Sequence, residues 1–166
     1  MGHEGMEKSE IPCGVVTVSS SRTEDTDESG QRLVEQLRAD GHRVVEKDLV
    51  PDNPPEVEDR IRDALSSEIR VLILTGGTGL STSDQTVDVL AKLEDRELPG
   101  FGERFRSLSY EDIGPRAILS RARASLAGDT LIFALPGSTA AVELAMNKLI
   151  LPTIGHALYE MDKEER

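Results

Sequence analysis

A glycine-rich turn after an apolar run is the first place where this sequence could do chemistry. The run 71–74 is followed by Thr75, Gly76, Gly77, Thr78 and Gly79. Such a turn can present backbone N–H groups to an anion, helped by the partial positive charge at the start of the next helix. The turn lacks the lysine of a nucleotide P-loop and the spacing of a dinucleotide fingerprint. It therefore indicates either anion binding or a plain strand-to-helix turn.

Two aspartates add a second kind of chemistry, metal binding. Asp84 follows the glycine-rich turn, and Asp52 follows the run 44–50. A carboxylate repels a phosphate, so an aspartate at a phosphate site requires a divalent cation between them, and Mg²⁺ prefers oxygen ligands of this kind. Either residue could instead be structural, Asp84 as a helix N-cap and Asp52 as a turn residue after Pro51.

Small polar residues follow two further apolar runs. Ser19, Ser20 and Ser21 come after the run 13–18, and Pro136, Gly137 and Ser138 come after the run 130–135. Each segment alone could be an ordinary loop or turn. In open α/β sheets, however, ligands lie outside the carboxyl ends of the strands. We therefore expect these segments, the glycine-rich turn and the two aspartates to converge on one edge and form a site.

The pattern of apolar residues predicts the elements that must position this site. Short β-branched runs predict strands at 13–18, 44–50, 71–74 and 130–135. Helical spacing predicts helices at 27–40, from Pro54 after an Asn53 N-cap, near 87–93, at 101–108, at 116–124 and in the tail 142–161. Connections of this length must pass over the sheet. The predicted fold class is α/β, a three-layer α/β/α sandwich with a mostly parallel central sheet.

Length and composition limit the organisation of the chain. The 166 residues, 37% of them hydrophobic, predict a single domain over 11–166 after a disordered polar leader over 1–10. The leader has no apolar anchor with which to dock another protein. There is no run of 18 apolar residues and no secretion signal, so we expect a cytoplasmic protein without membrane association.

Charge and side-chain chemistry exclude several functions. A net charge of −12 repels nucleic acid and anionic lipid. Only five of the 19 basic residues are lysine, which favours a halophilic cytosol over an ordinary acidic one. Cys13 is predicted to be a buried, inert thiol, and the three histidines have no zinc-ligand spacing. The arginines in the predicted helix at 116–124 are either solvated charges or phosphate clamps: Arg116, Arg121 and Arg123.

Three motifs together resemble the MoaB/MogA family of molybdenum cofactor biosynthesis proteins, which includes the gephyrin N-terminal domain. They are the segments 75–84, 95–103 and 135–138, and the similarity runs from about Gly14 to Met161. The resemblance implies a molybdopterin-binding fold and an activity in which molybdopterin attacks the α-phosphate of Mg-ATP to give adenylyl-molybdopterin and pyrophosphate. It also implies a homo-oligomer, trimer or hexamer, and other cofactor-biosynthesis enzymes as further partners.

The resemblance also assigns roles to particular residues. It implies that Asp52 and Asp84 are the catalytic residues and hold Mg²⁺. The substrate-binding residues it implies are Ser19, Ser20, Ser21, Thr75, Gly76, Gly77, Thr78, Gly79, Ser81, Pro136, Gly137 and Ser138. One position departs from the family: Ser83 stands where transferase members often have a basic residue. This departure leaves open an alternative function, in which the protein binds or delivers molybdopterin without turning over ATP.

Overall fold

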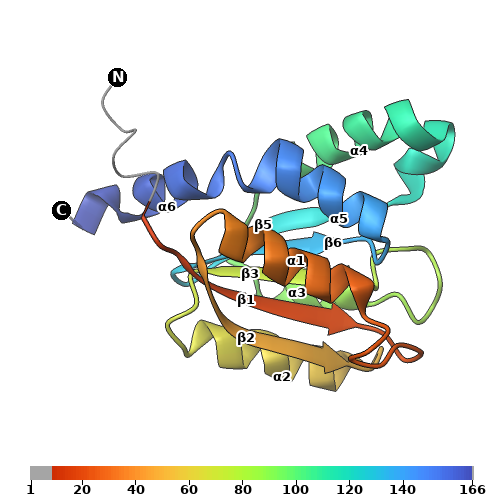
Figure 1. The fold of residues 1–166 in the computed structure, drawn as a ribbon, viewed down its shortest axis with the longest axis horizontal. Helices are drawn as coiled ribbons and strands as arrows, with labels where there is room; N and C mark the ends of the chain where they lie inside the picture. Colours follow the sequence, from red (N-terminus) through yellow and green to blue (C-terminus); the bar gives the residue numbers. More distant parts are fainter. Residues whose placement is uncertain (1–8, 166) are drawn as a thin grey trace.

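The computed structural model describes residues 9–165 and arranges them in three layers (Figure 1). Within this range six strands form one sheet, in the order β2, β1, β3, β6, β5, β4. They are β1 (Pro12–Val18), β2 (Arg43–Val50), β3 (Val71–Thr75), β4 (Arg96–Glu97), β5 (Arg123–Ala127) and β6 (Thr130–Leu135). The strands β2, β1, β3 and β6 are parallel, and β5 is antiparallel to both of its neighbours. The predicted mostly parallel sheet is confirmed.

Helices cover both faces of the sheet and bury two separate apolar clusters. The helices on one face are α1 (Glu28–Ala39), α4 (Pro99–Ile113), α5 (Thr139–Ala145) and α6 (Ile154–Asp162), and those on the other are α2 (Pro54–Leu65) and α3 (Thr86–Leu93). Neighbouring strand residues point to opposite faces, so Val15 belongs to the first cluster and Val16 to the second. The three-layer α/β/α sandwich is therefore confirmed.

The ends of the first two helices follow the predicted capping chemistry in part. Asp27 caps α1 by accepting a hydrogen bond from the N–H of Gly30 at 3.0 Å. Gly41 ends the same helix with φ +89°, a conformation that glycine adopts without strain. Asn53 occupies the predicted N-cap of α2, but its side chain makes no capping hydrogen bond. The fixed φ of Pro54 at the first helical position supports the start of this helix instead.

The predicted helix at 116–124 is found only in part. A 3₁₀ helix occupies Gly114–Leu119, but the segment then leaves the helix and β5 begins at Arg123. The strand forms because it pairs with β6 across a tight turn at Gly128 and Asp129, where Gly128 has φ +55°. A Gly-Asp pair between two apolar runs is a hairpin signal, and it was the feature that could have predicted β5.

Other element bounds also differ from the sequence prediction. The helix predicted at 101–108 is longer, because it starts at Pro99 and continues to Ile113 as α4. The two-residue strand β4 was not predicted, and the strand at 130–135, predicted as the fourth, is the sixth. The tail is helical as predicted but is divided into α5, a π-helical turn at Met146–Ile150, and α6.

Three sequence expectations concern single residues or the chain ends. The predicted burial of Cys13 is confirmed, and this burial raises the pKa of its thiol to about 12. Of the predicted leader 1–10, only Ser9 and Glu10 lie within the described residues. No helix between residues 9 and 165 combines the length and the apolar character needed to cross a membrane.

The edge strand β2 carries two carboxyl groups side by side. Glu46 and Asp48 are two residues apart on the side of the strand that faces α2, where Asp48 lies 3.7 Å from Arg60. A hydrogen bond with Asp48, and then burial, raise the pKa of Glu46 from 4.5 to about 7. Between about pH 4.5 and pH 7 the folded chain therefore holds a proton that the unfolded chain releases. The stability that this proton contributes is complete below about pH 4.5 and is lost as the pH rises through about 7.

We expect Glu46→Gln to raise the free energy of unfolding more at pH 8 than at pH 5, compared with the native chain. The neutral amide cannot acquire the negative charge that forms beside Asp48 at the higher pH. Urea unfolding at the two pH values measures the effect. Glu103→Gln, at an exposed position of α4, is the matched control for removing one charge. An equal change for Glu46→Gln at both pH values would contradict the prediction.

Candidate functional site

The carboxyl ends of four parallel strands meet at one edge of the sheet. Val18 of β1 pairs with Val50 of β2, and Thr75 of β3 pairs with both Thr17 of β1 and Leu135 of β6. The loops that follow these strands therefore start side by side, in the order β2, β1, β3, β6. We call these loops, residues 19–26, 51–53, 76–85 and 136–138, the rim. The predicted convergence of the site segments on one edge is thus found in the structure.

The serine loop after β1 is hydrogen-bonded to Asp52. The N–H of Ser20 donates to Oδ2 of Asp52 at 3.2 Å, and the N–H of Asp52 donates to Oγ of Ser20 at 3.0 Å. Oγ of Ser19 accepts from the N–H groups of Ser21 and Arg22, at 3.3 and 3.1 Å. The two hydroxyl groups thus shape the loop. Among residues 9–165, no hydrogen-bond donor occupies Oδ1 of Asp52.

The glycine-rich turn requires glycine at two positions. Gly76 and Gly77 have φ of +104° and +73°. A Cβ on Gly76 would collide with the carbonyl oxygen of Val18, and a Cβ on Gly77 would collide with the hydroxyl of Thr86. The backbone of the turn therefore passes too close to its neighbours for any residue other than glycine.

The turn leaves part of its backbone available to a ligand. The N–H of Gly76 is already used, because it donates to the carbonyl of Leu135 at 2.8 Å. The hydroxyl of Thr75 donates to the carbonyl of Pro136 at 2.9 Å. In the described chain, no residue accepts from the N–H groups that follow, those of Gly77, Thr78 and Gly79. Three consecutive backbone donors of the turn are therefore unpaired within residues 9–165.

Asp84 lies against the glycine-rich turn and does not cap α3. The N-cap of α3 is Gln85, so the N-cap interpretation of Asp84 is wrong. Oδ2 of Asp84 accepts from the N–H of Ser81 at 3.0 Å, and the N–H of Asp84 donates to the carbonyl of Ser81 at 2.9 Å. A Cβ on Gly79 would lie 2.7 Å from the same Oδ2. The missing side chain of Gly79 thus provides the space for this carboxylate.

The segment 136–138 closes the rim on the side of β6. The carbonyl of Gly137 accepts from the hydroxyl of Ser29 at 2.6 Å, and Oγ of Ser138 caps α5 by accepting from the N–H of Ala141 at 3.2 Å. A Cβ on Gly137 would lie 3.7 Å from the Cα of Gly76. The turns after β3 and β6 are therefore in close contact.

Two residues of the rim and its border were not predicted as site residues. Both terminal nitrogens of Arg22 lie 3.9 Å from the position that a Cβ on Gly137 would take, and within residues 9–165 this guanidinium has no ion-pair partner. The hydroxyl of Thr86 is buried and has no hydrogen-bond partner in the described structure. An arginine directly after the serine loop of an acidic chain was a usable signal for the first, whereas burial of a threonine hydroxyl cannot be read from sequence.

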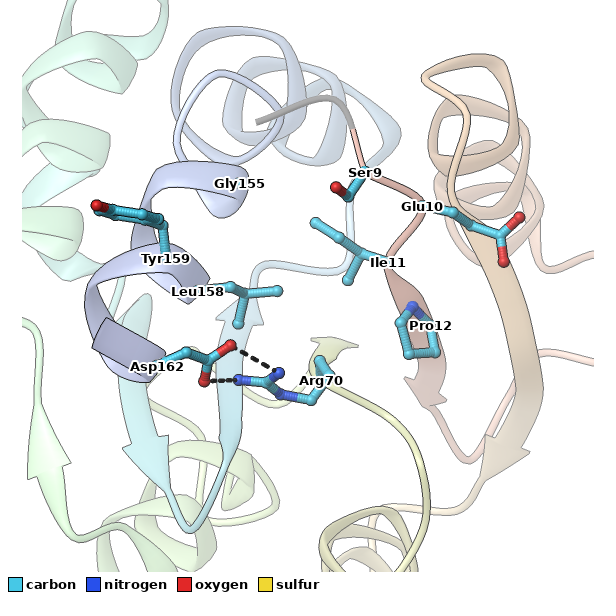
Figure 2. A pocket seen from close by; sticks show the side chains of 9 residues that line it. All are labelled: Ser9, Glu10, Ile11, Pro12, Arg70, Gly155, Leu158, Tyr159 and Asp162. Atoms are coloured by element: carbon cyan, nitrogen blue, oxygen red, sulfur yellow. Dashed lines mark hydrogen bonds and ion pairs between the residues drawn. The ribbon is translucent and has the colours of Figure 1, made fainter. Parts of the chain in front are cut away.

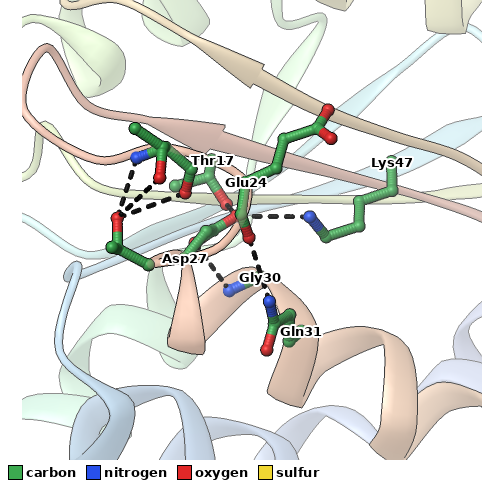
Figure 3. Close-up of polar contacts among 8 residues, drawn as sticks. Thr17, Glu24, Asp27, Gly30, Gln31 and Lys47 are labelled. Carbon is green, nitrogen blue, oxygen red and sulfur yellow. Dashed lines mark hydrogen bonds and ion pairs between the residues drawn. The ribbon is translucent and has the colours of Figure 1, made fainter.

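A buried carboxyl group connects the two ends of the loop 19–26 (Figure 3). Asp27 is completely buried, and its Oδ2 accepts from the hydroxyl of Thr17 at 2.7 Å. Lys47 of β2 lies 3.4 Å from the same oxygen. Buried charges are tolerated only when paired and hydrogen-bonded, as here. The network joins β1, β2 and the start of α1.

Another hollow lies away from the rim, near α6 and the start of β1 (Figure 2). Its volume is about 190 Å³. Its charged residues already have partners: Arg70 forms a bidentate pair with Asp162 at 3.2 and 2.8 Å, and Glu10 pairs with Arg43 at 3.0 Å. We therefore place the functional site at the rim, where donors and carboxylates remain available. An open hollow there borders Asp84, Asp88 and Arg121.

Comparison with known sequences gives a match over most of the chain. Residues 14–156 match a family model described as "Probable molybdopterin binding domain". "Molybdenum cofactor biosynthesis protein B" of Bacillus cereus is 42% identical over 164 residues, which cover 98% of this chain and 97% of that protein. The protein of the same name from Bacillus subtilis is 41% identical over 157 residues, which cover 93% and 92%.

Comparison with solved structures also finds similarity to proteins of molybdenum cofactor biosynthesis. A crystal structure of "Molybdenum cofactor biosynthesis protein B" superposes with a TM-score of 0.91 at 42% identity, covering 94% of this chain and 98% of that one. The "Molybdopterin biosynthesis enzyme MoaB" of Thermus thermophilus superposes with a TM-score of 0.79 at 32% identity, covering 92% and 97%. The similarity in sequence and in structure thus extends over nearly the whole described chain.

Proposed function

Because the chain belongs to the MoaB family of molybdenum cofactor biosynthesis proteins, we propose that it transfers the adenylyl group of Mg-ATP to molybdopterin. In this reaction a terminal phosphate oxygen of molybdopterin bonds to the α-phosphorus of ATP. The bond from that phosphorus to the bridging oxygen of the β-phosphate breaks, and pyrophosphate leaves. The observation that supports the proposal most is the meeting of two carboxylates and a turn with free N–H groups at one rim.

The rim fits phosphate groups. Three consecutive N–H groups, those of Gly77, Thr78 and Gly79, are free to donate. Arg22 adds a positive charge without a carboxylate partner among residues 9–165, and the Thr86 hydroxyl lies directly against Gly77. Hydrogen bonds between charged partners are stronger than neutral ones, so Arg22 is the strongest single contact available to a phosphate oxygen.

Asp52 and Asp84 are the residues that would hold Mg²⁺. They follow β2 and β3, which are separated by one strand, so the strand ends are about 10 Å apart. Across residues 9–165, no three His, Cys, Asp or Glu side chains gather in a way that could hold a metal on their own. The rest of the coordination shell would come from phosphate oxygens and water, as is usual for Mg²⁺ at nucleotide sites. When bound, Mg²⁺ neutralises charge on the triphosphate and on the leaving pyrophosphate.

In the proposed reaction the protein holds the phosphates and the cation in position and supplies charges that interact with them. The N–H groups and Arg22 orient the phosphates, and the two aspartates fix the cation beside them. No side chain is needed as a general base, because the attacking phosphate of molybdopterin is already ionised at neutral pH. Phosphoryl-type transfer depends chiefly on such positioning and electrostatics.

A second candidate function is the binding or delivery of molybdopterin without ATP turnover. The residue before Asp84 favours it: Ser83 brings no positive charge, and its hydroxyl lies 3.0 Å from that of Ser81. The trimeric or hexameric assembly implied by the resemblance stays a prediction for either function.

Pyrophosphate release separates the two functions. We expect the purified protein to release pyrophosphate from Mg-ATP only when molybdopterin is present, and to form adenylyl-molybdopterin in equal amount. Omission of molybdopterin, or replacement of Mg²⁺ by EDTA, should abolish release. Binding of molybdopterin without any release of pyrophosphate would reject adenylylation and support the delivery function.

A further inference from the structure

The side chain of Arg121 contacts the rim at two places and a carboxylate next to the rim at a third. Nε donates to the carbonyl of Gly79 at 3.0 Å, and Nη2 donates to the carbonyl of Asp84 at 2.6 Å. Nη1 donates to both carboxylate oxygens of Asp88, which borders the rim, at 3.0 and 3.1 Å. The N–H of Arg121 also donates to the carbonyl of Thr78 at 3.0 Å. The residue is thus neither a solvated helix charge nor free to bind phosphate, the two roles expected from sequence.

The hydrogen bonds from Arg121 hold the loop 79–84 against the rest of the protein. Within the described chain, hydrogen bonds from beyond residue 85 reach this loop only from Arg121. The remaining bonds are local, mainly those between Ser81 and Asp84. Leu80 is 66% exposed, so apolar packing does little to fix the loop. The planar guanidinium can hold several acceptors in a fixed geometry, which a lysine cannot do.

The pairing leaves the Asp84 carboxylate available. Arg121 binds Asp84 through its backbone carbonyl and pairs its charge with the carboxylate of Asp88 instead. The hydrogen bond from Arg121 lowers the pKa of Asp88, which favours the ionised form that pairs with the guanidinium. Asp84, Asp88 and Arg121 line one hollow at the rim, and Asp88 is the carboxylate there that pairs with the guanidinium.

We propose that Arg121 is a positioning residue for Asp84, and that Asp88 holds the guanidinium away from the Asp84 carboxylate. The inference rests on the function proposed above. It predicts that replacing Arg121 or Asp88 speeds hydrogen exchange in the loop 79–84 and also raises the Mg²⁺ concentration that the protein requires.

The test uses Arg121→Lys and Asp88→Ala, with Arg62→Lys as the control. Arg62 forms an ion pair with Glu58 on the surface of α2, at 3.3 Å, away from the rim. Hydrogen exchange is measured for the backbone of residues 79–85, and the Mg²⁺ concentration for half-maximal pyrophosphate release is measured at saturating ATP. For Arg121→Lys we expect exchange at Ser81 and Asp84 to become about tenfold faster or more, and the Mg²⁺ requirement to rise by a similar factor.

Asp88→Ala should raise the Mg²⁺ requirement in the same direction, and it carries the test if Arg121→Lys does not fold. Arg62→Lys should change neither quantity. Unchanged exchange at residues 79–85 would overturn the proposal, and so would faster exchange with an unchanged Mg²⁺ requirement, since Arg121 would then only stabilise the loop. If the native protein releases no pyrophosphate, adenylylation fails separately. The exchange rates and the Mg²⁺ dependence of ATP binding then decide the role of Arg121.

Discussion

Asp84→Asn is expected to lower adenylyl transfer on the order of a thousandfold or more while leaving molybdopterin binding intact. The amide oxygen can still accept from the N–H of Ser81, which now bonds to Oδ2 at 3.0 Å, so the loop keeps its shape. What disappears is the negative charge that would hold Mg²⁺ beside the triphosphate. Pyrophosphate release measures transfer, and a separate titration measures molybdopterin binding.

Asp52→Asn should likewise lower adenylyl transfer and leave molybdopterin binding intact. Its amide oxygen can keep the hydrogen bond from the N–H of Ser20, so a loss of activity would report the missing charge. Asp59→Asn, at an exposed position of α2, is the control for an acid-to-amide change and should leave turnover unchanged. Normal turnover in Asp84→Asn or Asp52→Asn would remove the role proposed for the two carboxylates.

Gly76→Ala is expected to destabilise the fold by about 3 kcal/mol or more. Two effects add. An alanine at φ +104° is strained, and its Cβ would collide with the carbonyl oxygen of Val18, which is backbone and cannot turn aside. The change also disturbs the contact between β1 and β3 at the base of the rim. Urea or thermal unfolding measures the loss.

Two other glycines separate these effects. Gly41 has φ +89°, but no atom lies within 4 Å of the position that a Cβ would take, so Gly41→Ala reports the strain alone and should cost about 1 kcal/mol. Gly100 lies in the first turn of α4 with open space around it, and Gly100→Ala should be neutral or slightly stabilising. If Gly76→Ala lowered the free energy of unfolding no more than Gly41→Ala does, the close approach to Val18 would contribute nothing to the loss.

The parallel part of the fold was predictable because each of its elements carries a local signal. The strands β1, β3 and β6 consist mainly of apolar residues and are buried, as expected for strands covered on both faces. Their carboxyl ends had to meet at one edge, so the position of Asp52, Asp84 and the glycine-rich turn followed from topology. The family resemblance pointed to the same residues.

The antiparallel part and the finer contacts depend on tertiary partners. The segment around Arg121 has helix-forming composition, but pairing with β6 makes β5 a strand, and this pairing outweighs local propensity. Asp84 precedes a helix as an N-cap would, yet its carboxylate lies against the turn, in the space left by the missing side chain of Gly79. The nearness of Arg22 to Gly137 joins loops more than 100 residues apart in sequence, which no local pattern encodes.

The two outer strands of the sheet have a consequence for how copies of the protein can associate. β2 presents Glu46, Lys47 and Asp48 along one border, and β4 at the opposite border consists only of Arg96 and Glu97. Charged or very short outer strands discourage a second chain from extending a sheet by backbone pairing. Copies of this protein are therefore expected to meet through helix and loop surfaces, and a continuous intermolecular sheet is disfavoured even in a crowded cell.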